Sequence, residues 1–257
     1  MIGKSLALLL AMALLSRASS GAIAETAGAG MAEVPGTLYR FPFRNAGVRE
    51  STMVKPFRLD RHPVTVREFL AFVRKNPEYA KSRIKPLFAD SLYLNSWSAD
   101  FRPPSDRIGD PVTEVSWFAA KAYCAEAGKR LPSTPEWEAA ATAVPAGMDS
   151  SGYVSGILDW YAKPDSHGKF IGKGSLNAYG IHDLHGKIWE WTSDFNAGGP
   201  SRSGANQGKA DAFFCGGAGQ ATADGVDYAT FMRFSFRSSL KPVFSVGSLG
   251  FRCAQGD

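Results

Sequence analysis

The first regular pattern along the chain is a set of apolar residues that recurs at the spacing of one helix face. Its members are Val66, Phe69, Leu70 and Val73. Thr65 directly precedes this set, and Glu68 follows it three residues later, which is the arrangement of a capping box that satisfies free N–H groups at a helix start. The pattern therefore predicts a helix over residues 66–75.

Two further helices are expected in the middle of the chain. Ser116 is suited to cap a helix that ends at Gly128. The apolar face of this helix consists of Trp117, Ala120, Tyr123, Cys124 and Ala127. Ser133 and Glu136 form a second capping box, which predicts another helix behind them.

Other segments lack a helical period. Residues 57–65 alternate between apolar and polar side chains before they turn at Pro63. Residues 76–110 are punctuated by proline and rich in Tyr, Phe and Trp, which favours a packed irregular segment over a linker. The 27 glycines and 15 prolines of the 257 residues agree with a low content of regular structure.

The N-terminus has the composition of an export signal. Lys4 precedes an apolar run over residues 6–15, and Ala22-Ile-Ala24 resembles a cleavage site, so cleavage is expected after Ala24. The run is short for a bilayer span, and no later run is long enough for one. A soluble, periplasmic or secreted protein is predicted. Its basic residues are scattered among acids, which argues against a nucleic-acid surface.

Residues 177–194, with the sequence NAYGIHDLHGKIWEWTSD, are denser in special residues than an ordinary loop. Gly180 allows backbone angles that are closed to other residues. In an extended segment Trp189 and Trp191 share one face, and Glu190 points the other way. A carboxylate directed inward at this place needs a cation or several hydrogen-bond donors as partners.

This stretch resembles the signature N-x-x-G-L/I-x-D-M/L-x-G-N-V/A-W-E-W-T-x-D of formylglycine-generating enzymes, the sulfatase-modifying factors. The stretch PVTEVSWFAAKAYCAEAGKRLPSTPEWEAAA matches a second family pattern, and the resemblance covers residues 31–254. It implies an α+β fold of one domain, related to C-type lectins and with much irregular backbone. The chain is accordingly divided into a signal peptide (1–24), a disordered leader (25–30) and a sulfatase-modifying-factor-like domain (31–257).

The chain has three cysteines, an odd number for an exported protein. The family joins the cysteine before G-x-R-L-P to the cysteine of G-F-R-C-A, so the resemblance implies a disulfide between Cys124 and Cys253. Cys215 is then unpaired. It is either a small buried hydrophobe beside two glycines, or a thiol that serves as a metal ligand or catalytic nucleophile.

Formylglycine-generating enzymes carry a C-x(4)-C pair whose thiolates bind copper(I) and activate oxygen. The matching positions of this chain hold Asp224 and Ala229. Because a soft copper(I) ion needs thiolate-type ligands, neither residue can replace the pair. The sequence therefore predicts that the chain does not oxidise a sulfatase cysteine by the family mechanism, and whether any catalysis remains stays open.

Other residues are candidates for a metal site. His182 and His185, with Glu190 nearby, either bind a transition metal or belong to a polar turn with local hydrogen bonds. Family members bind calcium around the G-N-x-W-E loop, where this chain keeps Glu190 but has Lys187 in place of Asn. The Lys187 ammonium could replace the ion. Calcium, copper and iron ions stay open as cofactors.

Three arginines lie on the C-terminal segment that matches the family: Arg233, Arg237 and Arg252. They either bond carbonyls of irregular backbone or line a cleft and bind an anionic group bidentately. Arg237 and Cys215 are the candidates for any remaining catalysis.

The resemblance leads to two functional hypotheses. In the first, the chain is an exported family member that acts in maturation of another exported protein or metabolite. Divergent family members include one that acts in maturation of the pyoverdine chromophore and a group encoded with copper nitrite reductases. Residues 214–219 and 227–240 resemble that group. In the second, it is a non-catalytic, lectin-like binding module, because a fold does not fix a function.

Overall fold

The computed structural model describes residues 30–45, 48–162, 176–196 and 225–256, and only the backbone within 42–50 and 225–227. These residues form one α+β domain. The expected signal peptide and leader, Cys215 and Asp224 lie outside the described residues. Among the helices in the described ranges, none is long and apolar enough to cross a membrane.

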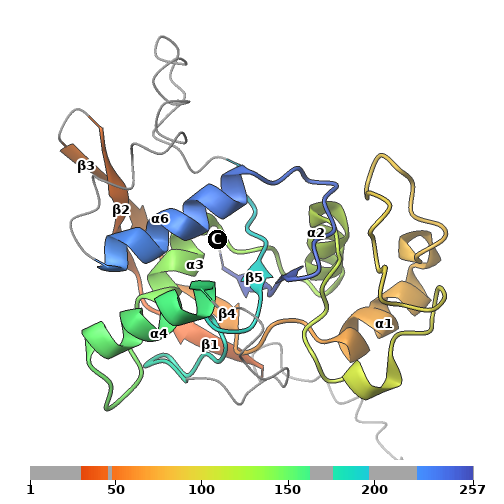
Figure 1. Ribbon diagram of the computed structural model, residues 1–257, viewed down its shortest axis with the longest axis horizontal. Helices are drawn as coiled ribbons and strands as arrows, with labels where there is room; N and C mark the ends of the chain where they lie inside the picture. The colour runs from red at the N-terminus through yellow and green to blue at the C-terminus, as the bar shows by residue number, and fades with distance from the viewer. Residues whose placement is uncertain (1–29, 46–47, 163–175, 197–224, 257) are drawn as a thin grey trace, which may run out of the picture.

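The beginning and the end of the domain meet in a three-stranded antiparallel sheet (Figure 1). The central strand β4 (Phe57–Asp60) pairs on one side with β1 (Met31–Val34) and on the other with β7 (Ala254–Gln255). The alternation predicted for this part of the chain is confirmed, since Phe57 and Leu59 are buried while their neighbours are half-buried.

A separate antiparallel hairpin is formed by β2 (Thr37–Asn45) and β3 (Val48–Val54). The hairpin packs on α3 and α6. Tyr39 and Val54 are buried, whereas the cross-strand partners Leu38 and Met53 are exposed.

The third strand pair is short and parallel, and it joins β5 (Trp189–Glu190) to β6 (Leu249–Gly250). In Figure 1, β5 lies at the centre of the molecule, with α2 on one side and α3, α4 and α6 on the other. The stretch that is densest in special residues is therefore brought to the middle of the fold.

The three helices predicted from the sequence are present as α1 (Val66–Lys75), α2 (Trp117–Glu126) and α3 (Thr134–Ala141). Both predicted capping boxes are confirmed, because the side chains of Thr65 and Ser133 accept from the backbone three residues on and the two glutamates bond back. Ser116 caps α2 by accepting from the backbone N–H of Ala119.

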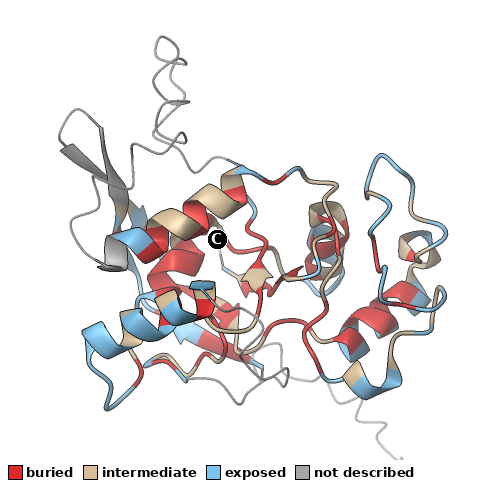
Figure 2. Cartoon of the chain, in the orientation of Figure 1, coloured by how far each residue is buried: buried red, intermediate tan, exposed pale blue. Residues whose placement is uncertain are grey.

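Two further helices were not predicted: α4 (Ser150–Ala162) and α6 (Gly225–Ser238). Gly152 and Gly156 lower the intrinsic helix propensity of α4, and only Ile157 and Trp160 of its side chains are buried, so its apolar period is weak. It lies on the outside of the domain, against α6 (Figure 2).

The irregular segment 76–110 is packed into the domain, as predicted. It contains two short 3-10 helices, η1 (Pro77–Tyr79) and η2 (Ser105–Arg107). Leu94 and Trp97 of this segment are fully buried in the hydrophobic cluster that also contains α1 and α2. A second hydrophobic cluster joins the three-stranded sheet to α3.

A disulfide joins Cys124 on α2 to Cys253 near the end of the chain, the pair that the family resemblance implied. Both cysteines are fully buried, and 129 positions separate them. In the chain-entropy description, closing so long a loop contributes about 4–5 kcal/mol to stability by restricting the unfolded chain.

Position 250 has no room for a side chain, because Val112 and Ile188 pack directly against the backbone of β6 there. A Cβ atom at position 250 would lie 2.8 Å from Ile188 Cδ1 and closer still to the carbonyl oxygen of Val112. Because a backbone carbonyl cannot rotate away, we expect Gly250→Ala to lower the free energy of unfolding by about 2 kcal/mol or more. Gly247→Ala is the matched control, since a Cβ there meets no atom within 4 Å. Equal denaturant midpoints for the two variants would contradict this account.

Candidate functional site

A buried ion pair lies at the centre of the molecule, between Glu190 on β5 and Arg252 before β7. The guanidinium donates two parallel hydrogen bonds, from Nε to Oε2 and from Nη2 to Oε1, both 2.8 Å. Trp137 Nε1 donates a third, of 2.7 Å, to Oε2. The sequence-based expectation that an inward Glu190 needs a cation and donors is confirmed. Arg252 is the partner that sequence reasoning did not assign.

Arg252 uses its remaining donors on backbone carbonyls. It donates to the carbonyl oxygens of Asp60 and His182, each at 3.0 Å. One guanidinium therefore ties together the end of β4, the loop at residue 182 and strand β5. Because both charged groups are fully enclosed, these hydrogen bonds are what make the burial of the pair tolerable.

A second buried charge cluster lies beside the first. Glu138 of α3 accepts hydrogen bonds from two arginines of α6, Arg233 and Arg237, at distances of 2.6–3.0 Å. The two arginines are four residues apart, so they lie on one face of the helix. Burial alone would raise the pKa of the Glu138 carboxyl, but the charges and hydrogen bonds of Arg233 and Arg237 outweigh it and hold this pKa below its ordinary value.

Trp137 connects the two charge clusters. Its indole N–H bonds to Glu190, while the guanidinium carbon of Arg237 lies 4.6 Å and that of Arg233 5.7 Å from its ring centroid. Such cation–π contacts stabilise desolvated guanidinium groups. The structure thus places Arg237, a candidate catalytic residue, in a buried network whose charge is shared with Glu138.

Ala229 occupies the helix turn before these arginines. Its side chain is buried, and its carbonyl oxygen accepts a hydrogen bond of 3.3 Å from the Tyr161 hydroxyl. The same hydroxyl accepts one of 2.9 Å from Arg233 Nη1. A methyl group has no electron pair for a metal, so position 229 does not fit the copper(I) ion that the resemblance implies.

The two candidate histidines lie in different surroundings. His185 meets Trp137 and Tyr153 edge to face, at centroid distances of 5.5 and 5.7 Å, and its Nε2 lies 3.4 Å from the carbonyl oxygen of Ala141. Burial first, and the positive charge of Arg233 second, lower the pKa of His185 to about 3. The imidazole is therefore neutral at any ordinary pH.

His182 stacks on His62 instead, with ring centroids 4.7 Å apart and planes inclined by 12°. Stacked imidazoles cannot share one metal ion, because the lone pair of each nitrogen lies in its own ring plane. Burial, followed by the charges of His182 and Arg252, lowers the pKa of His62. These surroundings therefore favour the neutral form of His62.

Across the described part of the chain, no three or more His, Cys, Asp or Glu side chains gather in a way that could hold a metal ion. Glu190 has both oxygens engaged by Arg252 and Trp137, so its carboxylate does not fit a calcium ligand in this arrangement. A metal role for Glu190, His182 and His185 stays a prediction, as does the role of Cys215.

Comparison with known proteins identifies the family to which the chain belongs. The family profile described as "Sulfatase-modifying factor enzyme 1-like domain" matches residues 24–256. The chain is 32% identical to "Inactive C-alpha-formylglycine-generating enzyme 2" of Bos taurus, over 81% of this chain and 80% of that protein. It is 27% identical to "Formylglycine-generating enzyme" of Thermomonospora curvata, over 88% of this chain and 93% of that protein.

The fold is also that of a solved structure. "Structure of PvdO from Pseudomonas aeruginosa" superposes with a TM-score of 0.50 and 19% sequence identity, and the match covers 88% of this chain and 94% of that one. At this identity the likeness concerns the fold.

The central ion pair can be tested by neutralising its carboxylate. We expect Glu190→Gln to lower the free energy of unfolding by about 3–5 kcal/mol, because it leaves the buried Arg252 charge without a counter-ion. Glu126→Gln, which removes an exposed partner of Lys75, should cost less than about 1 kcal/mol. Chemical denaturation under non-reducing conditions measures both, and similar small losses would show that the pair is dispensable.

The buried imidazole of His185 predicts a pH dependence of stability. Its folded-state pKa is lowered from 6.5 to about 3, so the unfolded chain binds the additional proton between these values. Stability is therefore lost as pH falls below about 6.5, by up to about 1.4 kcal/mol per pH unit from this group. His185→Phe should flatten the curve between about pH 6.5 and pH 5, above the range in which the carboxylates titrate. Parallel curves for variant and wild type would contradict this assignment.

Proposed function

The chain belongs to the sulfatase-modifying factor family, and from this premise we propose that it is an exported maturation factor that does not generate formylglycine. Its client is another exported protein. We take that client to be an enzyme of a copper nitrite reductase system, because residues 214–219 and 227–240 resemble the family members encoded with such enzymes. The chain would act in the periplasm or outside the cell.

The observation that carries this proposal is the contrast between position 229 and its surroundings. The buried charge clusters on α3, α6 and β5 are complete, so the fold that supports the family site is retained. Position 229, which the resemblance matches to a family cysteine, holds a buried alanine. A protein that keeps the scaffold but loses a thiolate ligand keeps the shape that recognises a partner and loses copper-dependent cysteine oxidation.

A second candidate function is a non-catalytic binding module. It is favoured by the 32% identity to a protein whose printed name calls it inactive. The two functions differ in stoichiometry, because a maturation factor is released after each client, whereas a binding module stays with one partner.

The absence of formylglycine generation can be tested directly. The mature protein is mixed with copper(I), oxygen and a peptide that contains C-x-P-x-R, and the aldehyde product is sought by mass spectrometry. We expect no product above the control without enzyme, whereas an active formylglycine-generating enzyme in parallel should convert the peptide. Turnover by this chain would refute the assignment.

The maturation role is tested in the native host. Deletion of the gene should lower the copper content and activity of the nitrite reductase while the amount of its polypeptide stays constant, and the wild-type gene should restore both. In vitro, a small fraction of the purified chain should support maturation of a molar excess of client. If each molecule of the chain supports maturation of only one client molecule, the binding module is favoured. If the copper content and activity of the nitrite reductase are unchanged in the deletion strain, this client is refuted.

A further inference from the structure

We propose that an apolar patch rimmed by lysines, beside the start of α2, is the surface on which the client protein docks, and that the matching client surface is apolar and acidic. This inference rests on the proposed function, since it presupposes a protein client. It concerns a face of the molecule outside the buried charge clusters described above.

The patch gathers much of the exposed apolar surface of the described residues. Leu87, Phe88 and Leu92 lie within six positions of one another on the irregular segment, and their side chains are 72%, 37% and 53% exposed. Single exposed apolar side chains are common on soluble proteins, but a contiguous group marks an interaction site.

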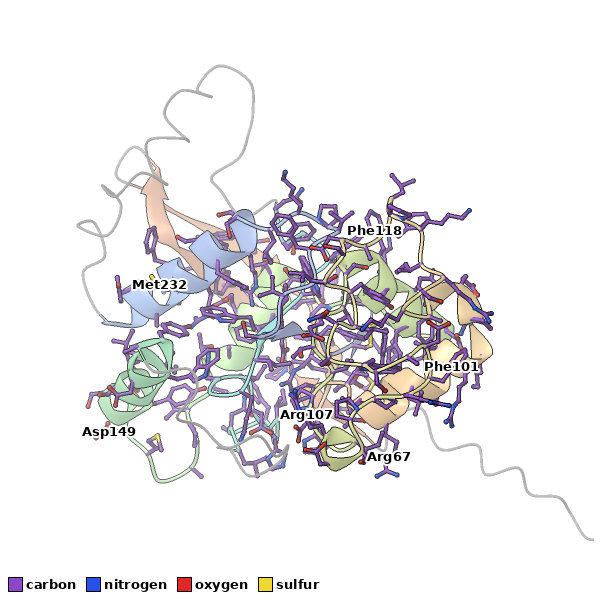
Figure 3. The ribbon with its side chains drawn as sticks, turned by 45° about the vertical axis from the view of Figure 1, so that its right-hand side comes forward. Arg67, Phe101, Arg107, Phe118, Asp149 and Met232 are labelled. Carbon is purple, nitrogen blue, oxygen red and sulfur yellow. A yellow bond between two sulfur atoms is a disulfide. The ribbon has the colours of Figure 1, made fainter. Side chains whose placement is uncertain are left out.

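Contacts with two other segments extend this group into one surface. The ring of Phe88 lies 5.3 Å from that of Phe118, which in turn lies 5.5 Å from that of Trp117. Backbone hydrogen bonds join Trp117 N to Pro242 O and Asp90 N to Val243 O, so residues 241–246 border the same surface. Phe118, in the first turn of α2, is labelled in Figure 3.

Three exposed lysines lie on the same three segments of the chain: Lys85, Lys121 and Lys241. Lys121 Nζ lies 4.8 Å from the ring centroid of Trp117, and Lys241 Nζ lies 5.9 Å from that of Phe244. The ammonium groups of Lys121 and Lys241 thus lie over aromatic rings of the same surface.

Two acids, Asp90 and Glu114, lie near the three lysines, so the lysines outnumber them. Asp90 accepts hydrogen bonds from the backbone N–H groups of Leu92 and Ser245, and Glu114 accepts one from that of Ser96. Both carboxylates are therefore turned to the backbone. The outward face of the patch is apolar with a positive rim.

This composition favours an acidic protein over the other possible occupants. A second copy of the chain would bring the same lysines face to face, which is repulsive. Binding to anionic lipid typically uses clusters of about four to eight basic residues, more than the three present here. A protein surface with apolar residues inside a ring of Asp and Glu complements both the rings and the lysines.

The test measures binding of the purified mature chain to the apo form of the copper nitrite reductase. Leu87→Ser with Leu92→Ser, and separately Lys85→Glu with Lys121→Glu and Lys241→Glu, should each raise Kd by about tenfold or more. Added salt should raise Kd for the wild type and change it little for the charge-reversal variant. Leu38→Ser with Met53→Ser is the matched control, because these exposed residues lie on the β2–β3 hairpin, and it should change Kd less than about twofold.

Each other outcome overturns the proposal in a distinguishable way. If the wild type binds the client and the patch variants bind equally well, the docking surface is wrong while the proposed function stands. If the wild type does not bind the client, both fail. Patch-dependent binding to phosphatidylserine vesicles without patch-dependent client binding would assign the surface to lipid. Patch-dependent self-association in sedimentation would assign it to a second copy.

Discussion

The ion pair between Glu190 and Arg252 is the interaction on which the arrangement of this fold depends. A fully buried carboxylate and guanidinium are costly to remove from water, and they are tolerated when hydrogen bonds replace those lost to water. Arg252 makes four such hydrogen bonds, two to Glu190 and one each to the carbonyls of Asp60 and His182. Because these partners lie on β4, on the loop before β5 and on β5 itself, the electrostatic requirement of one side chain fixes the relative position of three segments.

Helix α3 connects this ion pair to a second buried charge cluster on α6. Trp137 bonds to Glu190 and Glu138 binds Arg233 and Arg237, so two successive residues of one short helix serve two charge clusters. Removing the carboxylate of Glu190 or of Glu138 would leave buried arginines without a counter-ion. A change at an uncharged position nearby carries no such electrostatic penalty. This difference explains how an uncharged residue such as Ala229 can vary while the charged framework around it persists.

Local signals in the sequence predicted a large part of the fold. The capping boxes at Thr65 and Ser133 depend on neighbouring residues only, and the helices that they begin were predicted correctly. α4 was missed because its glycines and its single buried side weaken the local pattern. The partners of Glu190 and Glu138 were missed for a different reason. These contacts span 53 to 99 positions in the chain, and no local pattern records which arginine meets which carboxylate.

The position of Ala229 within α6 determines what the loss of the cysteine pair means for chemistry. Ala229, Arg233 and Arg237 follow one another at steps of four residues, so they share one helix face, and Glu138 holds the two arginines of that face. The Tyr161 hydroxyl bonds both the Ala229 carbonyl and Arg233, so α4 is packed directly on this turn. A thiol placed at position 229 alone would enter a buried site beside an arginine, without the second thiolate that copper(I) requires. Because α4 covers this helix turn and Glu138 holds the neighbouring arginines, a single substitution at position 229 would not create a copper(I) site.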